Sequence, residues 1–354
     1  MSLPLPSFLS SNNYNSSETS LLTEGPESDE EDEGPLLKQY RLKNMLGYGA
    51  CSTVYLAVDV STNIEYAIKE FKKTSLRRRE KFRLMQLEKE LGSFNDMDSS
   101  TIEDQIRNQE KKDPYYYIRK ELDVLKVLDH ENVVKLYQVI NSDYKDSLCM
   151  VLNYCPGGKL ASVDHGISFD PMPLETCRKS FRQLVLAVNY IHGKGVIHRD
   201  IKPDNILFKE NNNLCVIDFG LAEFLPKDGF VKPASGTPAF MAPELFDNEL
   251  KKIKGKPLDI WSMGVTLYVI AFAEFPFNGS TILDMINVIK GKSLMIPAYC
   301  NSDLRKLLER CLEKNPEKRI TIEELLRDPF LTERGKHHLT SSSIVTAFSS
   351  IWEI

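Results

Sequence analysis

The cysteines of this chain follow no recognisable pattern. Its 354 residues contain seven cysteines, with no Cys-x-x-Cys pair and no histidine at the spacing of a zinc ligand. An odd number of scattered cysteines argues against a disulfide framework and against a zinc site. We therefore expect reduced thiols in a cytoplasmic protein, with a nuclear location left open.

Long apolar runs are also missing. The most apolar stretch, residues 265–277, contains Glu274 and is too short to span a bilayer. The first ten residues, MSLPLPSFLS, lack the basic region of a signal peptide, and no glycine follows Met1 for myristoylation. The sequence therefore predicts neither a membrane span nor secretion.

A strongly basic surface is the third absence. The formal net charge is −5, and residues 1–37 hold eight acidic side chains and no lysine or arginine. Without these eight, 42 of the 50 acidic residues remain against all 45 basic ones, which gives no reason to expect a nucleic-acid partner. Residues 1–37 are also rich in serine and asparagine, so we expect a disordered acidic tail. A partner or phosphorylation segment around Ser28 is the alternative.

The chain beyond this tail changes from strand patterns to helix patterns. Alternating apolar residues predict strands over 40–46, 52–60, 64–71, 133–140 and 148–154. A helix over 115–128 would place four residues on one face: Ile118, Leu122, Leu125 and Leu128. Further helices are expected at 174–193, 259–275, 281–290, 303–313 and 321–327. This order indicates an α+β protein in which a β-rich lobe precedes an α-rich lobe, with a cleft between them.

The stretch GVIHRDIKPDNILF, residues 195–208, holds a polar loop between two short apolar strands. Asp200 has the length and charge to accept a hydroxyl proton, and Lys202 can offset phosphate charge. Asn205, together with Asp218 further along the chain, offers the hard oxygens that Mg²⁺ prefers. The loop therefore indicates phosphoryl transfer. Glycoside hydrolysis by two carboxylates would not explain the lysine, the asparagine or the glycine that follows Asp218.

Two weaker signals lie nearer the start. Gly47 and Gly49, in LGYGACSTV, would let backbone N–H groups approach an anion, although an ordinary glycine-rich hairpin explains them equally well. Ser52 replaces the third glycine of a dinucleotide-binding turn. Lys69 lies in the middle of a predicted strand, where a lysine usually faces solvent. Glu121, on the core-facing side of the predicted helix, is a candidate partner if Lys69 is buried.

Together these motifs strongly resemble the eukaryotic protein kinase family over about residues 40–331. The resemblance rests on Gly47-x-Gly49 with Val54, Ala67-Ile68-Lys69, Glu121, His198-Arg199-Asp200, Asn205, Asp218-Phe219-Gly220 and Ala242-Pro243-Glu244. It implies a bilobal fold with a small β-rich lobe at 40–153, which carries one key helix and a charged insert at about 72–113. A larger helical lobe would follow at 154–331, and residues 332–354 would form a docking or regulatory tail.

The same resemblance implies ATP and Mg²⁺ as cofactors and assigns roles to residues. The catalytic set would be Asp200, Lys202, Lys69 and Glu121, and the metal ligands Asn205 and Asp218. The nucleotide site would comprise Leu46, Gly47, Gly49, Val54, Ala67, Lys69, Asn153, Cys155 and Leu207, with Leu152 as gatekeeper. A stacked spine would comprise Leu125, Leu136, His198 and Phe219. Asp259 would steady the loop of Asp200, and Arg319 would pair with Glu244.

Lys202 and the Gly236-Thr237-Pro238 motif look like the serine/threonine class, in which Thr237 would bond to Asp200 and Lys202. Three departures narrow this resemblance. Pro233 stands where many kinases carry a phosphorylated residue. Lys159 replaces an acid common in kinases that select an upstream arginine. Lys69 and Glu121 are 52 residues apart, about 30 more than is usual for the family, and the insert includes the basic cluster 77–79.

With these three features, the sequence resembles the calcium/calmodulin-dependent protein kinase kinases and the liver-kinase-like upstream kinases. The resemblance implies protein substrates, namely other kinases of the AMP-activated type, which would be phosphorylated on the activation-loop threonine. The C-terminal segment has apolar residues on one helical face and no basic residue after Lys336, which favours docking on the kinase itself over a calmodulin site. Two alternatives stay open: a basophilic calmodulin-regulated kinase, and a kinase-fold scaffold with secondary catalysis.

Overall fold

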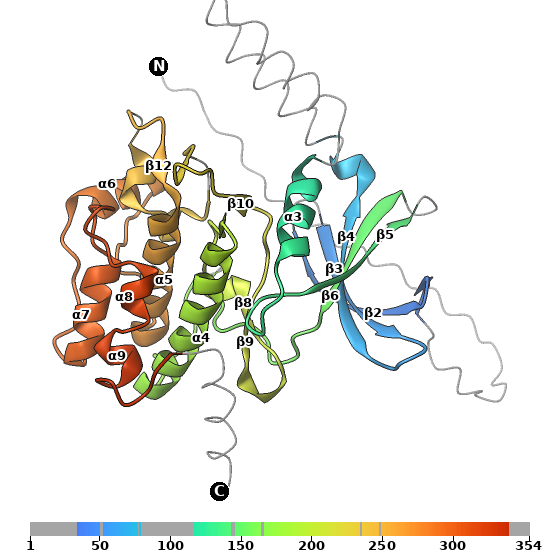
Figure 1. Cartoon of the computed structure of the whole chain (residues 1–354), viewed down its shortest axis with the longest axis horizontal. Coiled ribbons are helices and arrows are strands. Elements are labelled where there is room, and N and C mark those ends of the chain that lie inside the picture. Colours follow the sequence, from blue (N-terminus) through green and yellow to red (C-terminus); the bar gives the residue numbers. More distant parts are fainter. Residues whose placement is uncertain are drawn as a thin grey trace, which may run out of the picture.

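The computed structural model describes residues 34–49, 52–76, 78, 116–142, 146–163, 166–233, 236–247 and 249–339. An antiparallel sheet forms one part of the molecule and a group of helices forms the other (Figure 1). This arrangement confirms the α+β class with two lobes. Most of the predicted tail 1–37, most of the predicted insert at about 72–113 and most of the predicted tail 332–354 lie outside the described residues. The end of the predicted disordered tail is a correction, because Leu36–Leu37 forms strand β1, which pairs with β2 (Tyr40–Tyr48) and buries Leu37.

The sheet has six strands in the order β1-β2-β3-β4-β6-β5. The strands are β1 (Leu36–Leu37), β2 (Tyr40–Tyr48), β3 (Ser52–Asp59), β4 (Glu65–Lys72), β5 (Leu136–Ser142) and β6 (Ser147–Asn153). One face buries Ala57, Ile68, Ile140 and Val151 together. The five strands expected from the sequence are therefore present. β5 begins three residues later than predicted, because Val133 forms an isolated bridge with Val216, in which Val134 N donates to Val216 O and Val216 N donates to Asn132 O.

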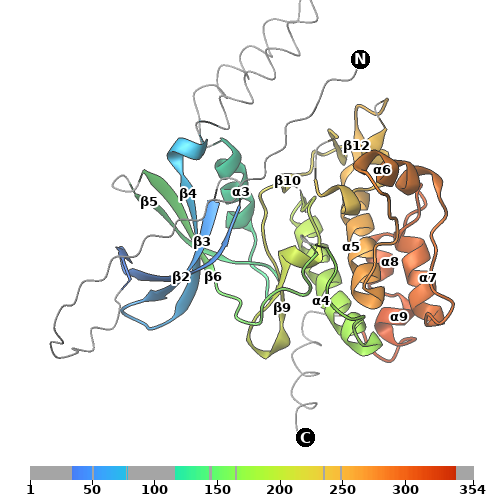
Figure 2. The same cartoon turned by 180° about the vertical axis from the view of Figure 1, so that it is seen from behind.

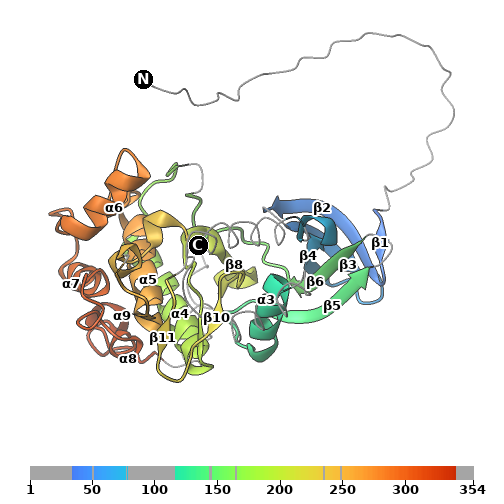
Figure 3. The ribbon, with the colours of Figure 1, turned by 90° about the horizontal axis from the view of Figure 1, so that it is seen from above.

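Helix α3 (Tyr116–Val127) lies at the boundary of the two parts, beside the short strand β10 (Glu223–Phe224) (Figures 1, 2 and 3). The predicted apolar face of this helix is confirmed: Ile118, Leu125 and Leu128 are buried, and Leu122 packs against the same core cluster. Glu121 is also buried. The helix thus turns one carboxylate inward, toward the sheet.

The second part is helical, and its long helices share one large core cluster with residues of α3 and of the sheet. Its helices are α4 (Leu174–Gly193), α5 (Gly255–Phe272), α6 (Ile282–Gly291), α7 (Ser302–Cys311), α8 (Ile322–Leu325) and α9 (Pro329–Thr332). Nearly every residue of α5 is buried, because α4 and α7 pack against it. In the described part of the chain, no helix combines the length and the apolar character needed to cross a membrane.

The observed helix limits correct several predicted ones. Helix α5 begins four residues earlier than expected, since Pro257 is compatible with a first helical turn. It ends at Phe272 because Ala273 adopts a left-handed conformation with φ of 52°. Helix α8 begins after Thr321, whose side chain forms a reciprocal capping box with Glu324. It ends two residues before the predicted limit.

Short strands hold the polar loop identified in the sequence. β7 (Val196–Ile197) pairs with β10, and β8 (Ile206–Phe208) pairs with β9 (Leu214–Val216). The residues that follow β6 bond to β8, through Gly157 N to Phe208 O at 2.9 Å and Leu160 N to Ile206 O at 2.7 Å. These bonds fix residues 198–205 beside the chain segment that leaves the sheet.

Candidate active site

A buried carboxylate anchors the loop 198–205. Asp259 on α5 is fully buried and accepts the backbone N–H groups of His198, at 2.9 Å, and Arg199, at 2.8 Å. The ring of His192 lies 2.8 Å from the same carboxylate. Burial alone would raise the pKa of Asp259, but the hydrogen bond with His192 and the neighbouring groups hold it below its usual value. The anchor also holds Arg199 in a left-handed conformation with φ of 69°.

The ring of His198 connects the loop to the next functional segment. Its Nδ1 atom accepts a hydrogen bond from Asp200 N at 3.3 Å, so the proton of the neutral ring lies on Nε2 and is donated to Ile217 O at 3.0 Å. The same ring contacts Phe219, with a distance of 4.8 Å between the ring centroids. The core cluster beside Phe219 also includes the other two residues of the predicted spine, Leu125 and Leu136.

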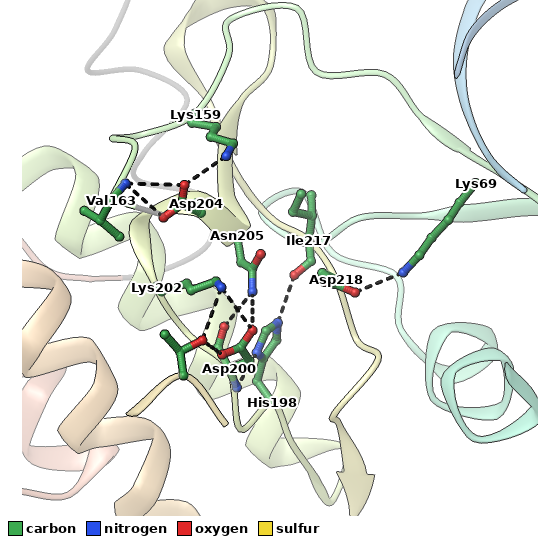
Figure 4. Close-up of polar contacts among 11 residues, drawn as sticks. Lys69, Lys159, Val163, His198, Asp200, Lys202, Asp204, Asn205, Ile217 and Asp218 are labelled. Carbon is green, nitrogen blue, oxygen red and sulfur yellow. Dashed lines mark hydrogen bonds and ion pairs between the residues drawn. The ribbon is translucent and has the colours of Figure 1, made fainter. Parts of the chain in front are cut away.

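Asp200 lies at the centre of a small polar cluster (Figure 4). Its Oδ1 atom accepts from Thr237 Oγ1 at 2.7 Å, and its Oδ2 atom accepts from Asn205 Nδ2 at 2.9 Å. Lys202 Nζ lies 3.2 Å from Thr237 Oγ1 and 3.7 Å from Asp200 Oδ2. The predicted contacts of Thr237 with both residues are present. The cluster therefore fixes one carboxylate next to one ammonium group.

A second cluster connects the sheet, α3 and the segment after β9. Lys69 Nζ lies 2.7 Å from Glu121 Oε1 and 2.9 Å from Asp218 Oδ1. Burial alone would lower the pKa of Lys69, but the two carboxylates outweigh it and raise the pKa, so the lysine is charged. Burial would raise the pKa of Asp218, and the charge of Lys69 holds it below its usual value instead. The structure thus brings together the predicted pair, 52 residues apart.

A comparison of the sequence with models of protein families identifies the family of this chain. Residues 104–331, more than half of the chain, match the protein kinase domain. The chain belongs to the protein kinase family. The sheet with α3 and the helical part are therefore the two lobes of a kinase fold, and the clusters around Asp200 and Lys69 lie where the two lobes meet.

Three curated relatives are similar to this kinase over most of its length. The calcium/calmodulin-dependent protein kinase kinase cmkC of Emericella nidulans is 34% identical over 317 residues, which cover 88% of the chain and 61% of the relative. CBL-interacting protein kinase 5 of Oryza sativa subsp. japonica is 32% identical, with coverage of 85% and 57%. CBL-interacting serine/threonine-protein kinase 18 of Arabidopsis thaliana is 32% identical, with coverage of 85% and 51%. The kinase thus spans between 51% and 61% of the length of these relatives.

The side chains predicted to surround the adenine come from both lobes of the kinase. The sheet register sets Gly47 opposite Val54, Val54 opposite Lys69 and Ala67 opposite Leu152. Four side chains predicted to contact the adenine are not fully buried by the described residues, so part of their apolar surface is exposed: Leu46, Val54, Ala67 and Leu207. A Cβ atom at Gly47 would meet no atom within 4 Å, so packing within the described residues does not require a glycine there.

The segment that joins the lobes was predicted to bond the adenine edge through two backbones. Asn153 N already donates to Lys135 O at 3.3 Å, so its backbone could contact a ligand only through its carbonyl group. The side chain of Asn153 is also engaged, since its Oδ1 atom accepts from Lys135 N at 2.8 Å. Cys155, two residues after the end of this strand, is buried.

The predicted metal ligands offer hard oxygens on one side of Asp200. The Nδ2 atom of Asn205 donates to Asp200 O and to Asp200 Oδ2, and Figure 4 shows the amide oxygen directed away from Asp200. The side chain of Asp218 is 46% exposed. An amide oxygen and an ionised carboxylate fit Mg²⁺, which keeps several further positions for water and phosphate oxygens. Among the described residues, no group of three or more histidine, cysteine or acidic side chains is placed so that it could hold a metal ion.

Lys159 has a partner that the sequence analysis did not identify. Its Nζ atom lies 2.9 Å from Asp204 Oδ1, and the Asp204 side chain is 3% exposed (Figure 4). Asp204 also accepts the backbone N–H of Val163, at 3.2 Å from Oδ2. The only sequence signal was the place of Asp204 in the polar loop, two residues after Lys202.

Arg199 has an internal partner as well. It forms an ion pair with Glu223 on β10, and its Nη2 atom donates to Lys232 O at 2.8 Å. The sequence analysis noted Arg199 only as part of the His198-Arg199-Asp200 motif and did not identify Glu223 as its partner. The structure thus places a carboxylate of this chain against the arginine, which also bonds to the backbone of Lys232, the residue before Pro233.

The predicted pair of Arg319 and Glu244 is present in the helical lobe. Two parallel bonds of 2.8 and 2.9 Å join the guanidinium group to the carboxylate, and both side chains are buried. Arg319 Nη1 also donates to Pro257 O at 2.8 Å. This bidentate geometry fixes the segment after Ala242 against the start of α5.

Proposed function

We propose that this chain is an ATP-dependent serine/threonine protein kinase that phosphorylates the activation-loop threonine of other kinases of the AMP-activated type. The kinase domain would comprise residues 40–331, with lobes at 40–153 and 154–331. The observation that carries the proposal is the cluster in which Asp200, Lys202 and Thr237 meet within hydrogen-bond distance.

In the proposed reaction, the carboxylate of Asp200 orients the acceptor hydroxyl group and takes its proton. Lys202 lies close enough to the same carboxylate to face the transferred phosphoryl group. Lys69, held by Glu121, would bind the ATP phosphates and position them for in-line attack. Mg²⁺, held by Asn205 and Asp218, would neutralise charge on the phosphates.

Two ion pairs support an upstream kinase that needs no phosphorylation of its own. Glu223 already forms an ion pair with Arg199, so a phosphate is not required to neutralise this arginine. Lys159 neutralises Asp204, so the substrate side of the loop offers no unpaired carboxylate to an arginine. The relative from Emericella nidulans, described as a calcium/calmodulin-dependent protein kinase kinase, is consistent with this proposal.

Two alternatives make different predictions. A kinase-fold scaffold would keep its signalling role when Asp200 is changed. A basophilic kinase regulated by calmodulin would prefer a basic peptide and would bind calmodulin in calcium. A cytoplasmic site of action, with the nucleus open, agrees with the free thiols of the six described cysteines.

The test measures phosphate transfer from Mg·ATP by phosphatase-treated protein. The two acceptors are an inactive kinase domain of the AMP-activated type and a short basic peptide, and Asp200→Asn is the inactive control. We expect labelling of the activation-loop threonine, which the control abolishes. Preference for the basic peptide would contradict the proposed substrate class. Transfer to neither acceptor would favour the scaffold.

A further inference from the structure

A cleft of about 620 Å³ lies where α7 approaches α9. Both helices are on the side of the helical lobe that faces away from the sheet (Figures 1 and 2). Four of the nine residues that line the cleft can carry a positive charge, Lys306, Arg327, Arg334 and His338, and only Asp303 is acidic. The lining is therefore dominated by basic groups.

The acidic residue of this lining already has a partner. Asp303 accepts two hydrogen bonds from Arg334, at 3.0 Å from Nε and 3.3 Å from Nη2. The bond with Arg334, together with the charges of Arg334 and Lys306, holds the pKa of Asp303 below its usual value. Within the described ranges, the exposed side chains of Lys306 and Arg327 form no hydrogen bond or ion pair. The cleft thus keeps two cations that have no carboxylate of their own.

A strained turn after α9 forms one wall of the cleft. Residues 333–335 have successive φ values of 49°, 57° and 88°, in a region that residues with a side chain rarely adopt. The turn is held by an ion pair of 2.7 Å between Glu333 and Arg182 on α4. It reverses the chain, so that Arg327 before α9 and His338 after it line the same cleft. Such strain persists only where surrounding contacts hold it, and it is common at ligand sites.

The chain itself carries hydroxyl groups directly beyond this cleft. The last described residue, Leu339, packs against the large core cluster and follows His338 in the lining. The next four residues are Thr340 and the serines at 341–343. Three residues of extended chain span about 10 Å, which is on the order of the width of a cleft of 620 Å³. A group on Ser341 can therefore reach back across the cleft.

A phosphate on such a serine has the charge and the acceptors that the two cations lack. Phosphorylation of serine adds a charge of about −1.5 to −2 and three strong acceptor oxygens. A guanidinium group such as that of Arg327 can bind two of these oxygens at once, and an ammonium group such as that of Lys306 binds as a point charge. An unmodified serine offers neither the charge nor the oxygens.

We propose that this cleft binds the phosphate of phosphorylated Ser341 or Ser342 of the same chain, through Lys306 and Arg327. The modification transfers the γ-phosphoryl group of ATP to the serine oxygen, with ADP as the leaving group and the hydroxyl proton released to solvent. A serine/threonine kinase supplies this step. The bound phosphate fixes the start of the segment 340–354 to the α7–α9 side of the helical lobe, so phosphorylation decides whether the segment is attached there.

The experiment uses the purified full chain with phosphoserine encoded at Ser341 and, in a second preparation, at Ser342. Phosphorus NMR follows the second ionisation of the phosphate as the pH is changed. This pKa is about 6 for a free phosphoserine, and the nearby cations should lower it by about one pH unit in at least one preparation. Because the phosphate is encoded, the result does not depend on the proposed kinase activity.

Two variants show which side chains lower this pKa. Lys306→Ala combined with Arg327→Ala should return it to about 6. Lys318→Ala removes an exposed lysine that does not line the cleft and should leave the lowered value unchanged. Lys306→Gln combined with Arg327→Gln repeats the test if the alanine variant melts below the parent. Dilution of the protein should not change the pKa, because the phosphate and the cleft belong to one chain.

The proposal is overturned if the phosphates of both preparations titrate like free phosphoserine. It is also overturned if the lowered pKa survives the loss of both cations. A lowering that disappears on dilution would place the phosphate in the cleft of a second copy and would contradict binding within one chain.

Discussion

Replacing Asp259 by asparagine tests the anchor of the loop that carries Asp200. The carboxylate accepts two backbone N–H groups and contacts His192, all at 2.8–2.9 Å and without exposure to solvent. An asparagine keeps one acceptor oxygen but turns an NH₂ group toward the remaining donor. One bond to a charged group, about 1.5–3 kcal/mol, is lost, and one buried N–H left without an acceptor costs about 1–3 kcal/mol.

We therefore expect the free energy of unfolding of Asp259→Asn to fall by about 3–5 kcal/mol. The melting temperature should fall by roughly 10 °C. Because the groups around Lys69 are untouched, kcat should fall while the KM for ATP stays close to that of the parent. Asp303→Asn, at a surface pair with the exposed Arg334, is the matched control and should leave the melting temperature unchanged. A variant with the same melting temperature as the parent would refute the reasoning.

The effect of pH gives a second check on the same carboxylate. The pKa of Asp259 is lowered in the folded protein, so its stabilising contribution is present above its unfolded value of about 3.9. This contribution is lost as the pH falls below that value and through the lower folded pKa. The free energy of unfolding in urea should therefore differ between the parent and Asp259→Asn by an amount that is constant near neutral pH and becomes smaller below about pH 4. A constant difference in acid would contradict the assignment.

Three further predictions follow from the ion pairs of the site. Lys159→Glu should increase kcat/KM for a peptide with arginine before the acceptor, relative to the same peptide with glutamine, and equal ratios in parent and variant would contradict the expected repulsion. Glu223→Ala leaves Arg199 unpaired, so phosphatase-treated protein should lose activity, whereas full activity would show that the pair is dispensable. Glu121→Gln removes the charge that holds Lys69, so the KM for ATP should rise, and an unchanged KM in steady-state assays would argue against positioning by this pair.

Local patterns in the sequence were sufficient for much of the fold. Helix α4 has the predicted limits, because its amphipathic pattern is bounded by Pro173 and Gly193. Helix α5 was placed less well. It is apolar on all sides, so the pattern of apolar residues does not mark where the helix begins or ends. Its end depends on the left-handed conformation of Ala273.

The site was predictable where neighbours in sequence are neighbours in space. Asp200, Lys202 and Asn205 share one loop, and the structure brings them together as the spacing suggested. The partners of Lys159 and Arg199 were missed, because each pair is set by the tertiary fold and not by a local repeat. Lys159 and Asp204 are 45 residues apart, and nothing in either local pattern indicates the other.

The bonds of Lys69 also bear on the order in which ligands enter the site. One ammonium group faces two carboxylates, Glu121 and Asp218, so these three side chains together carry more negative than positive formal charge. A bare triphosphate would meet net repulsion there, and Asp218 would have to exchange its lysine for another cation. For the activity proposed above, nucleotide and divalent cation should therefore enter as one complex, and ATP without the metal should compete poorly for the site.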